Sequence, residues 1–399
     1  MRKALFVLTA LTVATSTSHA QTVSNEEILQ KLQQLEKKVQ ELEKENRELK
    51  KLLYRRAAVV PLRKRTEKVK VGGRVLFRFS QTQDIDENGG KSIFGDYGNG
   101  FEVKKARLHV KGELNDNISY AIQIKADKGS QVQLWDAYIK YSFDSIPLSV
   151  KMGQFKTPVS MSYLKSGTKL WLPERPVAVN KIAPVWREIG VAATYKLFKE
   201  VKLTAGLFNG EGWSSDKNYN GDKKYLYTLS LDATPVNNED LTWRFRVGGE
   251  LGTDDSSKMV YNKAYKAVSV KRHLIDVETA IQFKPYNLAL EAGYLYDNPT
   301  DAKDSSGKEV SLGNAKGYYA QVNYGLPFFP KVHLVGRYSW LDPNDNADDK
   351  YDVDYTTVGF YYLLNGWQAA IRSSYTWANE RHGKEIDNNV FVTEFQLLF

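Results

Sequence analysis

Apolar and polar residues alternate with a period of two over most of the chain, from residue 68 to the C-terminus. Near the end, Ile371 and Tyr375 fall on one face of such a stretch, and Arg372 and Thr376 fall on the other. Strict alternation predicts a strand with one apolar and one polar face. The pattern divides the chain into sixteen candidate strands: 68–83, 101–114, 118–127, 131–141, 148–156, 189–197, 201–210, 225–233, 241–252, 270–283, 288–297, 316–326, 332–341, 353–364, 367–377 and 389–399.

The connections between these strands alternate in length. Those after even-numbered strands are short, and Asn365-Gly366 is predicted to be a two-residue hairpin turn. Those after odd-numbered strands are mostly long and polar, for example 84–100 and 298–315. Short turns on one side and long loops on the other are typical of transmembrane barrels. We therefore predict an all-β fold, a 16-stranded antiparallel transmembrane β-barrel spanning 68–399, with its apolar face toward lipid.

One long connection, 157–188, has a different composition. It carries apolar residues such as Leu170, Trp171 and Ile182, so we expect it to pack against other parts of the protein. A loop folded into the barrel lumen satisfies that expectation. Its five basic residues would then form a constriction: Lys165, Lys169, Arg175, Lys181 and Arg187.

The N-terminal region predicts export and a helix. Residues 1–20 combine two basic residues, a short apolar run and small residues before Gln21, which is typical of a signal peptide. Over 24–54, apolar residues recur at alternating spacings of four and three, which predicts an α-helical coiled coil. Residues 55–67 are predicted to form a basic linker. We expect this coiled coil to lie in the periplasm.

Bulk charge says little about partners, because most of the net charge of +9 lies outside the candidate barrel. The placement of the basic residues is more informative. The first strands place cations on the polar face that points into the lumen, where they could replace part of the hydration of a passing anion. The predicted anion pathway consists of Lys70, Arg74, Arg78, Lys105, Arg107, Lys111, Lys125 and Lys151. Inward acids such as Asp136, Asp276 and Glu278 could instead pair with inward bases and stabilise the wall.

Several motifs together resemble a known family. In chain order they are Val71-Gly-Gly-Arg74, Lys105-Ala-Arg-Leu108, Trp135-Asp-Ala-Tyr138, Gly153-Gln-Phe-Lys-Thr-Pro158, Glu174-Arg175, Arg187-Glu-Ile-Gly190 and Gly206-Leu-Phe-Asn-Gly210. With the terminal Phe399, they resemble the phosphate-selective porin O and P family of the bacterial outer membrane. The resemblance implies a homotrimer of barrels, each a passive channel for anions such as phosphate or chloride, with its third loop folded inward. It does not extend to the coiled coil.

Other functions remain as alternatives. The coiled coil and basic linker could tether the outer membrane to cell-wall polymer, with the barrel a non-selective pore. A catalytic role is not expected, because the four histidines after His19 lack metal-ligand spacing and no nucleophile motif is evident. We predict no cofactor, no metal and no nucleic-acid partner.

Overall fold

The computed structural model describes residues 30, 33–45, 69–83, 98–129, 131–183, 187–212, 220–221, 223–255, 260–383 and 386–399. The chain divides into two compact units, Met1–Glu67 and Lys68–Phe399. The predicted signal peptide and linker lie outside the described residues. Among the described residues, no helix is both long and apolar enough to cross a membrane.

The first unit contributes one described helix, at 33–45. Leu35, Val39 and Leu42 follow the predicted spacing of four and three, and all three are more than half exposed. This helix covers the middle of the predicted coiled coil, and the rest of that segment lies outside the described residues apart from residue 30.

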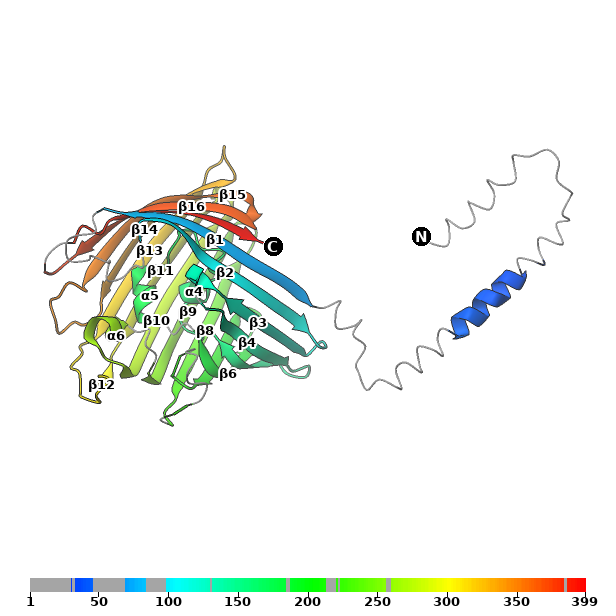
Figure 1. The fold of residues 1–399 in the computed structure, drawn as a ribbon, viewed down its shortest axis with the longest axis horizontal. Helices are drawn as coiled ribbons and strands as arrows, with labels where there is room; N and C mark the ends of the chain where they lie inside the picture. The colour runs from blue at the N-terminus through cyan, green and yellow to red at the C-terminus, as the bar shows by residue number, and fades with distance from the viewer. Residues whose placement is uncertain are drawn as a thin grey trace. The chain divides into compact units, whose positions relative to one another are not determined.

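The second unit is a closed antiparallel β-barrel (Figure 1). Its strands are β1 (Lys70–Thr82), β2 (Gly100–Glu113), β3 (Ile118–Lys125), β4 (Gln133–Ser142), β5 (Leu148–Phe155), β6 (Glu188–Lys196), β7 (Val201–Phe208), β8 (Leu226–Asn237), β9 (Leu241–Asp254), β10 (Ser269–Phe283), β11 (Leu288–Asp297), β12 (Thr300–Lys303), β13 (Ala315–Gly325), β14 (Val332–Asp342), β15 (Val353–Trp367), β16 (Ala369–Glu380) and β17 (Val390–Leu398). Short helices interrupt the long connections: η1 (Asp127–Gly129), α4 (Met161–Leu164), α5 (Val177–Ile182) and α6 (Val260–Tyr265), while η2 (Lys284–Tyr286) forms a short turn.

The wall contains sixteen strands, as predicted. β12 follows β11 after a two-residue break and pairs with the same neighbour, β10, so the two form one interrupted strand. β1 pairs with both β2 and β17, which closes the ring. Closure leaves no unpaired sheet edge, which a strand-built membrane protein requires.

The two faces of the wall differ as the alternation predicted. In β8, Tyr227 and Leu229 are more than half exposed on the outside, whereas Thr228 and Ser230 are buried inside. The predicted Asn365-Gly366 turn is displaced toward the C-terminus, because Asn365 O accepts from Gln368 N and Gly366 and Trp367 lie between them. Gly366 adopts a φ of 52°, which glycine tolerates without strain. As a result Trp367 packs with Tyr361 beside the loop residue Leu172, and not on the lipid face.

Candidate functional site: a basic cavity beside the inward loop

The connection after β5 contacts the inner face of the wall on many strands, and its helices α4 and α5 appear among the strands in Figure 1. α5 buries Val177, Ala178 and Ile182 in a cluster with wall residues of β13–β15. Gly317 on β13 makes this approach possible, because a Cβ there would lie 2.7 Å from the Ala178 Cβ atom. Apolar packing therefore fixes the second half of the loop.

Arginines of the wall fix the loop through its main-chain oxygens. Arg74 Nη2 donates to Gly167 O at 3.0 Å, and Arg337 Nη1 donates to Glu174 O at 2.7 Å. Arg372 Nη1 lies 3.2 Å from Gly167 O and 3.3 Å from Leu170 O. Arg246 and Arg272 donate in the same way to the carbonyls of Pro158 and Ile182. A charged donor makes these bonds stronger than neutral ones.

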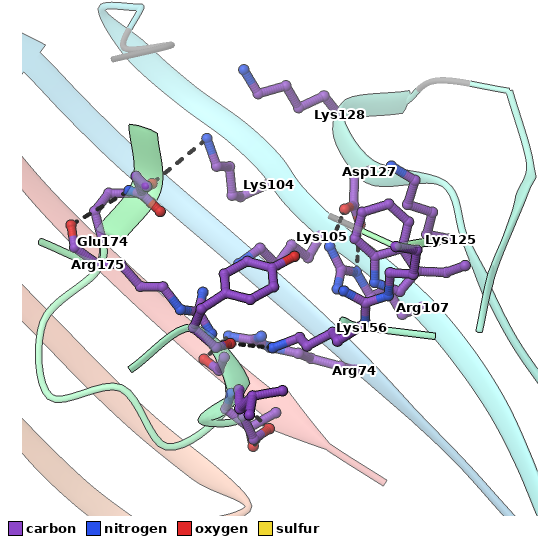
Figure 2. Close-up of a pocket in the computed structure, with 18 of the residues that line it drawn as sticks. Arg74, Lys104, Lys105, Arg107, Lys125, Asp127, Lys128, Lys156, Glu174 and Arg175 are labelled. Carbon is purple, nitrogen blue, oxygen red and sulfur yellow. Dashed lines mark hydrogen bonds and ion pairs between the residues drawn. The ribbon is translucent and has the colours of Figure 1, made fainter. Parts of the chain in front are cut away.

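A cavity of about 1110 Å³ lies between this loop and the wall. Among the described residues, its lining includes twelve Lys or Arg residues but three Asp or Glu residues, so its charge is strongly positive. The cations are Arg74, Lys104, Lys105, Arg107, Lys111, Lys125, Lys128, Lys156, Arg175, Lys181, Arg187 and Arg337, and the acids are Asp127, Asp136 and Glu174. Figure 2 shows cations from the wall and from the loop converging on the same space.

Some of these cations are paired with carboxylates. Arg107 Nε donates to Asp127 Oδ1 at 3.0 Å, and Arg187 donates to both oxygens of Asp136 at 3.0 and 3.1 Å. Lys104 Nζ lies 3.9 Å from a Glu174 oxygen. These pairs remove part of the positive charge and hold the side chains in place.

Four other lining cations contact no carboxylate among the described residues: Arg74, Lys105, Lys156 and Arg175. Lys156 Nζ donates to Tyr163 O at 2.5 Å. Arg175 Nε donates to Ser162 O at 3.1 Å, and its Nη2 donates to Lys165 O at 2.6 Å. A carbonyl orients a cation without bringing a compensating negative charge, so these side chains add to the positive potential of the cavity.

Aromatic rings separate the crowded cations. Around the Trp135 ring, Lys125 Nζ lies 3.8 Å from the centroid, Arg187 Cζ 4.2 Å and Arg107 Cζ 5.1 Å. The Tyr163 ring has Lys156 Nζ at 4.6 Å. The negative face of an aromatic ring attracts cations, so these rings offset part of the repulsion between like charges.

Two loop residues have pKa values shifted by this setting. Burial alone would raise the pKa of Glu174, but the charges of Arg78, Lys104 and Lys105 lower it below its ordinary value. For Lys156, burial together with the nearby charges of Arg175 and Arg187 lowers the pKa well below that of an exposed lysine.

Eight of the thirteen predicted site residues line the cavity: Arg74, Lys105, Arg107, Lys111, Lys125, Arg175, Lys181 and Arg187. The other five lie elsewhere. Arg78 is buried against Glu394 and Glu174, and Lys165 pairs with Glu291 at 2.7 Å. Lys151 lies over the rings of Tyr138 and Phe155, while Lys70 and Lys169 are exposed.

Sequence reasoning missed Lys104, Lys128 and Lys156. Lys104 is the extra residue of a β-bulge, because Leu76 pairs with Lys105 and Phe77 pairs with Val103. A bulge lets two successive side chains face the same side. The signal was present in the sequence: the outward apolar positions 101 and 103 are followed by 106 and 108, a change of parity. Lys128 and Lys156 lie in connections, where alternation predicts nothing.

Residues 69–399 match the family described as phosphate-selective porin O and P. The chain belongs to this porin family. Together with the barrel, this makes the protein an outer-membrane porin. A comparison with curated proteins finds no match. Among the described residues of this porin, no group of His, Cys, Asp or Glu could hold a metal ion.

Solved structures share the fold of this porin at low sequence identity. The channel DcaP of Acinetobacter baumannii has a TM-score of 0.56 at 14% identity, over 83% of this chain and 97% of that chain. An anion-selective porin from Comamonas acidovorans has a TM-score of 0.56 at 10% identity, over 83% and 99%. The outer membrane protein OmpT of Vibrio cholerae, in a trimer form, has a TM-score of 0.54 at 13% identity, over 83% and 99%.

Proposed function

We propose that this porin is a passive diffusion channel that prefers small anions, and that the cavity beside the inward loop is its constriction. The observation that carries the proposal is the lining of twelve cations and three carboxylates, with Arg74, Lys105, Lys156 and Arg175 held by no carboxylate among the described residues. Such a surface attracts anions and repels cations. Several adjacent cationic positions also let an anion move from one to the next without being trapped.

The test is the reversal potential of purified protein in a planar bilayer separating two KCl concentrations. We expect the potential to indicate chloride preference. A variant with Arg74, Lys105, Lys156 and Arg175 all replaced by Gln should lose most of it. Cation preference in the parent protein would contradict the proposal.

A preference for phosphate is a further part of the proposal. Arginine offers planar, forked donors that suit phosphate oxygens, and Arg74, Arg107, Arg175 and Arg187 all line the cavity. If phosphate binds there, added phosphate should block chloride current at concentrations well below that of chloride. Absence of block would leave a general anion channel.

The assembly we propose is a homotrimer in outer-membrane lipid, with the N-terminal helix forming a periplasmic coiled coil. The exposed Leu35, Val39 and Leu42 support this part, because a heptad seam is stable in water only when a partner helix covers it. Deletion of residues 21–60 should weaken the trimer while leaving the ion selectivity of each barrel unchanged. Intact trimers combined with a weakened cell envelope would favour a tether to cell-wall polymer instead.

A further inference from the structure

Buried acids on β10 lie opposite the cavity, behind the first turn of the inward loop. Asp276 and Glu278 are fully buried, and neither lines the cavity. If these carboxylates acted only through their charge, they would oppose anion passage. Their contacts suggest another role.

Both acids bind the segment that contains α4. Ser160 N donates to Asp276 Oδ1 at 3.1 Å. Ser160 Oγ donates to Glu278 Oε1 at 2.7 Å, and Ser162 N donates to Glu278 Oε2 at 2.9 Å. Glu278 therefore holds two donors of the turn, one with each of its oxygens. Charge-assisted bonds of this kind are short and directional.

Ser160 adopts a conformation that needs such support. Its φ is 52°, in the left-handed region, and its side chain is completely buried. Its Oγ also accepts from Tyr163 N at 3.1 Å, which caps the turn. A left-handed conformation is unfavourable for a non-glycine residue and persists only when surrounding contacts hold it.

The opposite side of the same turn faces the cavity. The carbonyls of Ser162, Tyr163 and Lys165 accept from Arg175 and Lys156, two of the lining cations that touch no described carboxylate. The turn thus connects the acids of β10 with the cations of the cavity: its amide and hydroxyl groups donate to the acids, and its carbonyls accept from the cations. If the turn rotates, both cations lose their acceptors.

We propose that Glu278 is a positioning residue for ion selectivity. It holds the α4 turn through Ser160 and Ser162, so that the turn's carbonyls keep Lys156 and Arg175 directed into the cavity. The inference rests on the proposed anion preference and adds to it a residue outside the cavity whose own charge has the wrong sign for a direct role.

The sign of the effect tests the proposal. Glu278→Gln removes the negative charge that the ionised Glu278 carries, so at a pH where Glu278 is ionised a purely electrostatic role predicts a higher chloride-to-potassium permeability ratio. The positioning role predicts a lower ratio, because two cations withdraw from the path of the ion. Moving even one unit charge away from an ion about 7 Å distant should lower the ratio about twofold or more.

Three further variants separate positioning from other effects. Ser160→Gly changes no charge and relieves the left-handed strain, yet removes the hydroxyl that binds Glu278, so it should also lower the ratio. Glu291→Gln removes a buried acid on the neighbouring strand that, among the described residues, hydrogen-bonds the side chains of Lys165 and Gln321 and not the main chain of the turn, so the ratio should stay the same or rise. In a Lys156→Gln, Arg175→Gln background, Glu278→Gln should no longer lower the ratio.

The measurements use bilayer reversal potentials on protein whose folding is checked by heat-modifiable mobility on gels. If Glu278→Gln does not fold, Ser160→Gly decides the question alone. An unchanged or higher ratio in folded Glu278→Gln or Ser160→Gly would overturn the positioning role while leaving anion preference intact. Absence of anion preference in the parent protein would instead refute the proposed function.

Discussion

Reversal of one cavity charge should change selectivity far more than reversal of a charge on the wall outside it. Lys105 and Lys151 were both predicted to belong to the anion pathway, but only Lys105 lines the cavity. Lys105 has no carboxylate partner among the described residues, whereas Lys151 lies against aromatic rings at 4.6 and 4.9 Å. The pair therefore offers a matched comparison, Lys105→Glu against Lys151→Glu.

The size of the effect follows from Coulomb's law. An ion passing about 7 Å from a unit charge in water at about 0.1 M salt experiences roughly 0.3 kcal/mol. Reversal changes the charge by two units and acts with opposite sign on chloride and potassium, so their difference changes by about 1.2 kcal/mol, or roughly sevenfold in permeability ratio. The low-dielectric walls of the cavity strengthen the field, so this roughly sevenfold change is a lower bound.

The assay is the reversal potential across a bilayer in a KCl gradient. We expect Lys105→Glu to shift it toward the potassium potential and Lys151→Glu to change the ratio less than about twofold, because its charge lies outside the cavity. Equal shifts in the two variants, or none in Lys105→Glu, would refute the assignment of the cavity as the selective constriction.

Four other outcomes follow from the site and from the pairing of β1 with β17 that closes the barrel. Trp135→Leu removes the ring between Arg107, Lys125 and Arg187, and should lower the thermal unfolding midpoint, with a loss on the order of 2 kcal/mol. Gly73→Val should reduce the folded fraction on gels, because a Cβ there would lie 2.4 Å from the Phe399 ring, whereas Gly98→Val meets nothing within 4 Å and should fold normally. Because the pKa of Lys156 is lowered by burial and by the nearby charges of Arg175 and Arg187, this lysine loses its proton before exposed lysines do as pH rises. Anion preference should therefore begin to decline at a pH below that at which exposed lysines titrate, and Lys156→Gln should reduce this early phase. The pKa of Glu174 is lowered, so its bond to Arg78 is kept above that lowered pKa and is lost only as the pH falls through it. Loop docking, measured as resistance to protease, should therefore survive into the acidic range. Glu174→Gln lacks the charged partner of Arg78, and its loop should be cleaved already at neutral pH.

The strands were predictable because each one follows a simple physical rule. A strand with lipid on one face and water on the other must alternate apolar and polar residues. Each predicted strand overlaps an observed one. The exceptions lie where a local irregularity replaces the rule. At β4, Trp135 is the extra residue of a second bulge, which places it and Asp136 on the same inner side.

The site was less predictable than the wall. Alternation shows that Arg78 faces inward, but not that Glu394 and Glu174 lie within 2.5 Å of it. Those partners are distant in sequence, and their positions depend on barrel closure and on the path of the loop. Sequence likewise gives no sign that Lys156, just beyond the end of β5, turns back to the carbonyl of Tyr163.

The use of main-chain oxygens by Arg74, Arg337 and Arg372 has a consequence for how this porin can vary. The main-chain carbonyl is the same whatever side chain a residue carries, so the bonds of Arg74 and Arg372 do not depend on which residues occupy positions 167 and 170. Apart from Glu174, whose side chain binds Arg78, side chains of the loop that face the passage can therefore be exchanged while these main-chain bonds persist. Wall and loop can change separately, and a series of loop variants on one constant barrel would give channels that differ in selectivity alone.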